Sequence, residues 1–368
     1  MEKFDKAGCF YEAFRLEPPA PSEADTITFI AALFHVDTMS VKHTAGSMFA
    51  GIGGICLGFE TAGVDIVWAN EIDPYACMTY RHNFNGAPFL HEEDIYKVDE
   101  NSIPKIDILV AGFPCQAFSI AGYRKGFEDA RGALFYEVMR VIRAKKPRAV
   151  FLENVKNLEN HDDGNTYRAI KRLLTDEGYL VIEKVMNTME YSNIPQNRER
   201  IYVVGFKKHD DGTCPEFDAF KFPDPVKLKA TIHDIINIHE KKDDSFYYGL
   251  NNPYYEKLDA AMTNPDTIYQ WRRVYVRENK SNVCPTLTAN MGTGGHNVPL
   301  IRDDFGIRKL TPEECLAFQG FPRDYSFPEM ANSHKYKQAG NSVSVPVISR
   351  IAHNIITSMR DTDSNVNL

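Results

Sequence analysis

A buried strand that ends in a tight turn is predicted by the stretch Ile106-Asp107-Ile108-Leu109-Val110-Ala111-Gly112-Phe113-Pro114-Cys115. The residues before Gly112 form a mainly apolar run, whereas Gly112 and Pro114 stop the strand and force a turn. Cys115 is therefore placed on a loop at the carboxyl end of a strand, where open α/β sheets collect ligands and catalytic groups. A following helix N-terminus lowers the pKa of a thiol in such a place. Because most single cysteines are small buried hydrophobes, a catalytic role depends on what else reaches this edge.

Strands and helices alternate from about residue 44, which predicts an α/β fold. Residues 49–54, Phe-Ala-Gly-Ile-Gly-Gly, form a glycine-rich turn between a strand and a helix, and such a turn suits a nucleoside cofactor. Glu71 ends the next strand about 20 residues later, where a carboxylate usually holds a ribose hydroxyl. Asp94 follows a third short strand and could either hydrogen-bond an adenine amino group or be a solvated turn residue.

Two further strand ends carry charged side chains. A strand predicted over 148–152 ends at Glu153, on the same sheet edge as Cys115. Arg198 and Arg200 stand two residues apart before the strand 201–206 and therefore share a face. They could clamp a carboxylate or a phosphate, or form a surface ion pair. A thiol, a carboxylate and an arginine pair at one edge favour a catalytic site.

The region from 207 to 300 breaks the alternation with frequent proline, aspartate and glycine. Within it, residues 269–280 carry Arg272, Arg273, Arg277 and Lys280 against Glu278, interleaved with aromatic residues. This composition is typical of a strand or ribbon that contacts nucleic acid, although a solvated strand with one buried face would look similar. Residues 116–131 combine glycine with charge and predict a mobile surface loop.

Composition restricts the class of protein. The 368 residues contain no apolar run near twenty residues and no signal-peptide pattern at the start, so we expect a cytoplasmic protein without a membrane span. The seven cysteines are scattered and never form a Cys-x-x-Cys pair, which argues against a disulfide framework and against a zinc site. The formal charge of −8 speaks against a general polycation but not against a nucleic-acid partner, because only the contacting face must be basic.

The ends of the chain add packing elements. Thr311 and Pro312 predict the start of a helix that runs to Phe318, and a second helix with an apolar stripe begins near Pro346. The polar tail from Asp361 is expected to be disordered. We divide the chain into an N-terminal extension (1–43), a catalytic domain (44–206), a target-recognition domain (207–307) and a hinge that returns to the catalytic domain (308–368).

In their order along the chain, several blocks resemble those of bacterial DNA cytosine-5 methyltransferases. The blocks are Phe49–Gly54, Asn70–Asp73, Gly112–Gln116, Glu153–Val155, Gln196–Arg200, Thr311–Pro322 and Gly340–Ser342. The resemblance covers residues 44–358 and departs at Ser47-Met48, where the family usually has an acid and a leucine. It implies a Rossmann-like mixed seven-stranded sheet with helices on both faces, plus a smaller, irregular, β-rich target-recognition domain.

The resemblance also implies a reaction and its residues. S-adenosyl-L-methionine would methylate C5 of a cytosine flipped out of double-stranded DNA, with Cys115 as nucleophile, Glu153 as the group that hydrogen-bonds the base, and Arg198 and Arg200 as positioning cations. Such enzymes, here expected as a monomer without a metal, belong to restriction–modification pairs that protect host DNA. The implied cofactor contacts are Phe49, Gly51, Gly53, Glu71, Ile72, Asp94, Pro114, Leu134, Asn341 and Ser342. The implied DNA contacts are Gln116, Ser119, Arg131 and Thr286. In the recognition region we expect Arg272, Arg273 and Arg277 to contact guanine or phosphate, since arginine pairs bidentately with guanine.

Two other functions fit part of the sequence. An RNA cytosine-5 methyltransferase would share the catalytic domain, but the Phe113–Gln116 block and the sizeable recognition region count against it. A non-catalytic DNA-binding relative would not need Cys115, Glu153 and the two arginines. The N-terminal extension is interpreted as a helical packing element, or as a helix-turn-helix, and the DNA target cannot be derived from the recognition region.

Overall fold

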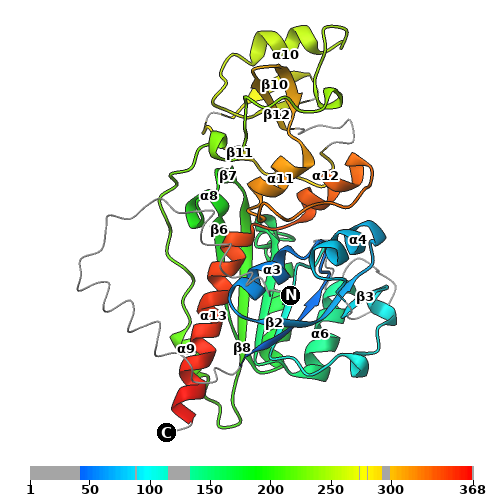
Figure 1. Ribbon diagram of the computed structural model, residues 1–368. Helices are drawn as coiled ribbons and strands as arrows, with labels where there is room; N and C mark the ends of the chain where they lie inside the picture. The colour runs from blue at the N-terminus through cyan, green and yellow to red at the C-terminus, as the bar shows by residue number, and fades with distance from the viewer. Residues whose placement is uncertain are drawn as a thin grey trace, which may run out of the picture. The chain divides into compact units, whose positions relative to one another are not determined.

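The computed structural model describes residues 42–87, 89–114, 133–272, 274–279, 281–291 and 299–366. The helices expected before residue 42, Cys115 and the loop 116–131 all lie outside the described residues. The part of the chain from Thr44 to Leu368 forms one compact unit (Figure 1).

A seven-stranded mixed sheet is the centre of this unit, as predicted. Its order is β3-β2-β1-β4-β5-β8-β6, with β1 to β5 parallel to one another and β8 antiparallel to both β5 and β6. The bounds are β1 Thr44–Met48, β2 Asp65–Glu71, β3 Leu90–Glu92, β4 Ile108–Ala111, β5 Ala149–Val155, β6 Tyr179–Asn187 and β8 Glu199–Lys207. All four residues of β4 are buried, in agreement with the apolar run that predicts it.

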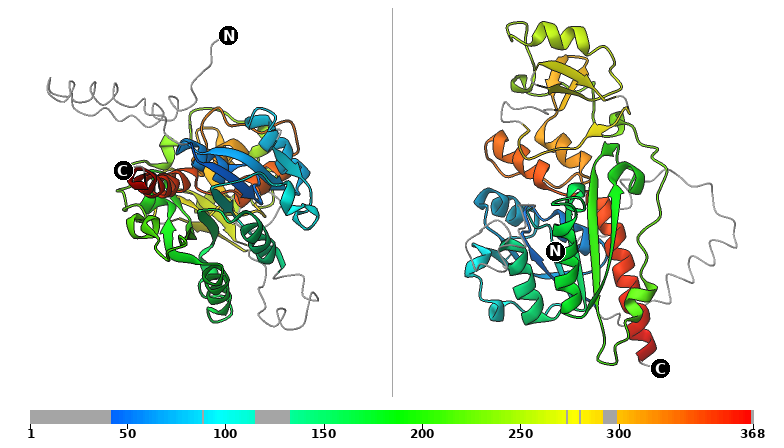
Figure 2. Two further views of the ribbon diagram at one scale, coloured as in Figure 1. Left: turned by 90° about the horizontal axis from the view of Figure 1, so that it is seen from below. Right: turned by 180° about the vertical axis from the view of Figure 1, so that it is seen from behind.

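Helices cover both faces of this sheet (Figures 1 and 2). Along β5, Val150 and Leu152 belong to the core that includes residues of α6 and α7, whereas Phe151 contacts Phe59 of α3 with ring centroids 5.3 Å apart. The helix α13 packs against α3. The bounds are α3 Gly54–Thr61, α4 Pro74–Asn83, α6 Ala133–Lys145, α7 Asn165–Asp176 and α13 Val345–Val366. No helix among the described residues is long and apolar enough to cross a membrane.

A second, four-stranded antiparallel sheet has the order β10-β9-β12-β13. One face of it, with Tyr269, Leu300 and Ile307, packs against Leu258 and Met262 of the α10 segment. The strands are β9 Tyr269–Arg272, β10 Tyr275–Glu278, β12 Pro299–Asp303 and β13 Gly306–Lys309, and α10 is Tyr255–Ala261. Because β13 spans residues 306–309, this sheet extends two residues beyond the expected end of the recognition domain at 307.

Short elements lie between and after the strands of the two sheets. They are α8 Thr188–Tyr191, α9 Pro215–Ala219, α11 Pro312–Phe318, α12 Asn332–Asn341, the paired strands β7 Gln196–Asn197 and β11 Cys284–Pro285, and the 3₁₀ helices η1 Ile95–Lys97, η2 Glu100–Ser102, η3 Lys156–Leu158, η4 Ile232–Asp234 and η5 Asp244–Phe246. The predicted start of α11 is confirmed, because Thr311 caps it and Pro312 is its first residue.

The expectation of a disordered tail from Asp361 is wrong. The helix α13 continues to Val366, and Arg148 holds Asp363 through both terminal nitrogens at 3.1 and 2.8 Å. Thr362 is buried and its hydroxyl donates to the Ser358 carbonyl one turn earlier. The polar composition of residues 361–366 conceals these contacts, because the ion-pair partner Arg148 lies 215 residues away in the chain.

Candidate active site

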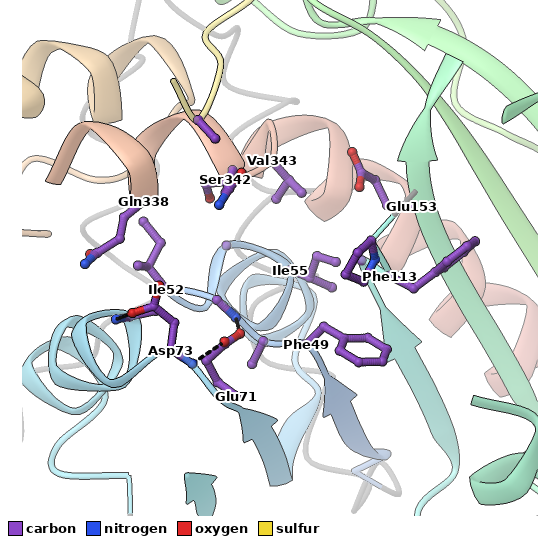
Figure 3. Close-up of a pocket in the computed structure, with 18 of the residues that line it drawn as sticks. Phe49, Ile52, Ile55, Glu71, Asp73, Phe113, Glu153, Gln338, Ser342 and Val343 are labelled. Atoms are coloured by element: carbon purple, nitrogen blue, oxygen red, sulfur yellow. Dashed lines mark hydrogen bonds between the residues drawn. The ribbon is translucent and has the colours of Figure 1, made fainter. Parts of the chain in front are cut away.

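A cavity of about 770 Å³ opens at the carboxyl edge of the large sheet (Figure 3). Its lining comes from the segments that follow β1, β2, β3 and β4, from the last residues of β5, from Arg198 and Arg200, and from the segments 287–289 and 337–343. Glu71 and Glu153 stand at different ends of this lining, with Ile55 between them. One cavity therefore joins the carboxylate of the predicted cofactor site to that of the predicted catalytic site.

The glycine-rich turn after β1 has an unusual backbone. Phe49, Gly51 and Gly53 all have positive φ angles, of 55°, 56° and 84°, in the left-handed region that favours glycine. A Cβ at Gly53 would also lie 2.4 Å from the ring of Phe84, so no larger residue fits there. This conformation brings the Gly51 amide to Glu71 Oε2 at 2.8 Å. The turn is thereby held against the end of β2.

Three acidic side chains line the mouth of the cavity. Glu71 Oε1 accepts from the amides of Ile72 and Asp73 at 2.9 and 2.8 Å, which leaves an acceptor position on Oε2 beside the Gly51 bond. Asp94 caps η1 by accepting from the Tyr96 amide at 3.2 Å. Asp73 caps α4 and pairs with Lys337 Nζ at 2.7 Å. Partial burial opposes ionisation of Asp73, but Lys337 and the capping amides hold its pKa below the usual value.

Glu153 lies at the inner end of the cavity and is only 8% exposed. Its Oε1 is 3.2 Å from Arg200 Nε and has no hydrogen-bond partner with good geometry among the described residues. The neighbouring Asn154 donates to the Phe113 carbonyl at 2.9 Å, and a Cβ at Gly112 would lie 3.7 Å from Glu153 Oε2. The residues just before Cys115 are therefore held beside the Glu153 carboxylate.

Arg198 is almost fully buried, at 2% exposed. One terminal nitrogen donates to the Leu287 carbonyl at 3.0 Å and the other to the Ser342 carbonyl. Burial, with the positive charge of Arg200 as a smaller cause, lowers the pKa of Arg198 to about 9. The side chain therefore stays cationic at neutral pH and adds positive charge behind Glu153.

The structure brings most of the predicted site residues together. Of the expected cofactor contacts, all except Gly53 line the cavity, and so do Glu153, Arg198 and Arg200. Gly53 instead lies behind the turn against Phe84. The hydroxyl of Thr286, predicted to contact DNA, donates to the Asn197 carbonyl at 2.7 Å. Five predicted residues lie outside the described residues: Cys115, Gln116, Ser119, Arg131 and Arg273.

Sequence reasoning missed several residues of the lining. Lys337 and Gln338 of α12 reach the cavity, and Gln338 accepts from the Thr79 hydroxyl of α4 at 2.7 Å. Asp73 could have been found from its place before Pro74, because an aspartate before a proline is a typical helix cap. Thr288 and Ala289 carry no local signal, since their place in the lining depends on contacts between distant segments.

The remaining predicted DNA contacts lie on the small sheet. Residues paired across antiparallel strands share a face, so the pairs Arg272–Tyr275 and Gln270–Arg277 point away from the face that packs on α10. Arg277 is exposed, Tyr275 is 58% exposed and Arg272 is half-buried. The same face carries Arg308, which binds Glu314 of α11 at 2.7 and 2.8 Å. Arg272, Tyr275 and Arg277 therefore lie on the face of the small sheet from which Arg308 reaches α11.

Comparisons with known proteins agree with this architecture. A family model described as "C-5 cytosine-specific DNA methylase" matches residues 44–357. The Type II methyltransferase M.Bsp6I of Bacillus sp. (strain RFL6) is 55% identical over 316 residues, which are 85% of this chain and 98% of that relative. The Type II methyltransferase M.HhaI of Haemophilus parahaemolyticus is 38% identical over 325 residues, with 85% and 94% covered.

Solved structures extend the comparison to the fold. A mutant of Spodoptera frugiperda DNMT2 superposes with a TM-score of 0.64 at 21% identity, covering 86% of this chain and 100% of that one. The Dnmt2 methyltransferase of S. pombe superposes with a TM-score of 0.65 at 20% identity, with 88% and 100% covered. At this identity the likeness shows the fold alone.

Proposed function

The chain belongs to the C-5 cytosine-specific DNA methylase family and is a DNA cytosine-5 methyltransferase, and on that premise we propose that it methylates a flipped-out cytosine with S-adenosyl-L-methionine. The cytosine lies within a specific short sequence of double-stranded DNA. The observation that carries this proposal is the single cavity that joins Glu71 to Glu153. A methyl donor at one end and a base at the other would meet inside it.

The outer end of the cavity fits the cofactor. Glu71 keeps an acceptor position, which we assign to a ribose hydroxyl. We assign Asp94, which lines the same cavity, to accept from the adenine amino group. Ile72 is 63% exposed on the rim, where a large apolar side chain offers a surface for a purine ring. The volume is in the range of small-molecule sites. The remaining proposed contacts are Phe49, Gly51, Pro114, Leu134, Asn341 and Ser342, all of which line the cavity, whereas Gly53 supports the turn from behind.

The inner end carries the proposed chemistry. Cys115, as a thiolate, adds to C6 of the cytosine, and the electrons of the C5–C6 double bond make C5 nucleophilic. Glu153 hydrogen-bonds N3 and the amino group and protonates N3, which stabilises the enamine. Arg200 holds the base carbonyl beside Glu153. S-adenosyl-L-methionine supplies the electrophilic methyl group. Loss of the C5 proton and elimination of Cys115 then restore the thiolate.

The target cytosine must leave the DNA duplex to react. A base that is stacked in a duplex cannot reach Glu153, which is only 8% exposed inside the cavity. We assign DNA contact to Gln116, Ser119 and Arg131 from the family resemblance, and to Arg273 from its place in the basic stretch 269–280. Arg272 and Arg277 are supported further by the face they share on the small sheet. Arginine is suited both to phosphate and to the guanine edge.

In the cell, we propose that this methylation protects host DNA from a cognate restriction endonuclease. The support is that M.Bsp6I and M.HhaI are both Type II methyltransferases by name.

Bisulfite sequencing of DNA from cells that express the chain tests the function directly. We expect 5-methylcytosine at one short sequence and unmodified cytosine elsewhere, because the recognition region selects the site. Cells with the empty vector are the control. An unmodified genome, or methylation confined to RNA, would contradict the proposal.

The cofactor assignment predicts a selective effect of Ile72→Ala. The affinity for S-adenosylhomocysteine, the product of methyl transfer, should fall about 5- to 30-fold, because burial of the isoleucine side chain is worth roughly 1–2 kcal/mol. Calorimetric titration with S-adenosylhomocysteine measures this affinity. Ile72 is 63% exposed, so the melting temperature should not change.

Leu250→Ala is the matched control, since Leu250 is 82% exposed and is not among the residues that line the cavity. It should keep wild-type affinity. Equal affinities in the two variants would remove Ile72 from the cofactor site.

A further inference from the structure

Tyr325 is a buried tyrosine outside the proposed catalytic and cofactor residues. It lies in the segment that follows α11, and its side chain is only 8% exposed. Its hydroxyl donates to the carbonyl of Ile52, 273 residues away in the chain, inside the glycine-rich turn after β1. Burial raises the pKa of Tyr325 well above its usual value, so the hydroxyl keeps the proton that it donates. A distant segment therefore holds the turn of the proposed cofactor site.

The bond to Tyr325 fixes one side of a single peptide group. The Ile52 carbonyl and the Gly53 amide belong to the same planar unit and point in opposite directions. The Gly53 amide donates to the Ala50 carbonyl at 2.8 Å, which fixes the other side. Gly53 has a φ of 84° and precedes Gly54, the first residue of α3. The orientation of this peptide therefore sets how the turn enters the helix.

The residues around this peptide line the proposed cofactor cavity. The bond from Tyr325 is buried, and Ile52 is only 3% exposed, so water cannot easily replace the tyrosine hydroxyl. A rotation of the peptide would move both the end of the turn and the start of α3. The lining residues of these two parts are Gly51, Ile52, Gly54 and Ile55.

Further contacts keep Tyr325 in place. Phe321 lies against it with ring centroids 4.5 Å apart, and the Tyr325 amide donates to the Pro322 carbonyl at 3.0 Å. The next residue, Ser326, is bound twice by Asn83 at the end of α4. Asn83 Nδ2 donates to the Ser326 carbonyl at 2.9 Å, and the Ser326 amide donates to Asn83 Oδ1 at 3.1 Å. The fold thus fixes the tyrosine that fixes the turn.

We propose that Tyr325 is a positioning residue for the cofactor, because its hydroxyl holds the Ile52–Gly53 peptide in the orientation that the cofactor needs. The inference rests on the proposed function, since it places the cofactor in this cavity. Without the hydroxyl, the Ile52 carbonyl is buried without this partner, and the peptide relaxes by turning away. Cofactor binding must then restore the original turn, which weakens binding. Glu153 lies at the other end of the cavity, so the reaction of bound cofactor is preserved.

The test measures the affinity of the full chain for S-adenosylhomocysteine by calorimetric titration. Tyr325→Phe removes only the hydroxyl. We expect it to raise the dissociation constant about 5- to 30-fold, because an unpaired buried acceptor changes an equilibrium by a factor of this order. In methylation of a duplex that carries the site found by bisulfite sequencing, the KM for S-adenosyl-L-methionine should rise while kcat stays within about twofold. A residue that only stabilises the fold would not change this KM.

Tyr179→Phe is the matched control. Tyr179 is 1% exposed and its hydroxyl donates to the Pro147 carbonyl at 2.7 Å, a bond of the same kind between two residues that are not among those lining the cavity. Both variants should lower the melting temperature, but Tyr179→Phe should keep the wild-type affinity. An unchanged dissociation constant in Tyr325→Phe, or an equal increase in both variants, would overturn the inference while the proposed function stands. No binding of S-adenosylhomocysteine by the wild type would overturn both.

Discussion

Cys115→Ser should abolish methyl transfer, lowering the rate by at least about 10⁴-fold, while the affinity for S-adenosylhomocysteine stays within about twofold of wild type. The reason is chemical: at neutral pH a cysteine is partly thiolate, whereas a serine hydroxyl without an adjacent base stays protonated. Asn154 holds the Phe113 carbonyl, and Gly112 lies beside Glu153, so the exchange of one atom at Cys115 should leave the cavity intact. Transfer of a radioactive methyl group to duplex DNA measures the rate.

Cys9→Ser is the control, because Cys9 precedes the residues 44–357 that match the family. It should retain wild-type activity. A duplex with 5-fluorocytosine at the target position checks the covalent step, since fluorine cannot leave C5 as the proton does and Cys115 cannot be eliminated. Wild type should form a complex that survives denaturation, and Cys115→Ser should not. Substantial methylation by the serine variant would remove Cys115 from its role as nucleophile.

Glu153→Gln should lower kcat by about 10²- to 10⁴-fold. The amide has nearly the same shape and can still hydrogen-bond the base, but it cannot deliver a proton to N3. The carboxylate is 8% exposed and its Oε1 faces Arg200 Nε at 3.2 Å, so no solvent acid replaces it easily. Because Glu71 and Ile72 lie at the other end of the cavity, the affinity for S-adenosylhomocysteine should change less than about threefold.

Glu199→Gln makes the same exchange on the adjacent strand. Glu199 is largely exposed and pairs with Lys156 at 2.8 Å, and exposed ion pairs contribute only about 0–1 kcal/mol. This variant should retain nearly full activity. Single-turnover rates of methyl transfer distinguish Glu153→Gln from Glu199→Gln. A Glu153→Gln rate within tenfold of the wild-type rate would argue against proton transfer by Glu153.

Several elements were predictable because their signals are local. The apolar run before Gly112 marks β4, and Thr311 with Pro312 marks the start of α11. The glycine turn and Glu71 indicate a cofactor site because strand ends of a parallel sheet share one edge, and the structure does place both in one cavity. The helical end of α13 was not predictable, since its polar last turns depend on Arg148 far away in the chain.

The sequence by itself determined the α/β fold, the family and which side chains stand at strand ends, because periodicity, turn residues and ordered blocks are properties of neighbouring residues. Only the tertiary structure decided how those side chains are used. It pairs Glu153 with Arg200, binds Arg198 to two distant carbonyls, and places Leu287–Ala289 in the cavity wall. It also selects which face of β9 and β10 packs on α10 and which face carries Arg272 and Arg277. These outcomes depend on packing between segments up to 144 residues apart, and no local pattern encodes such contacts.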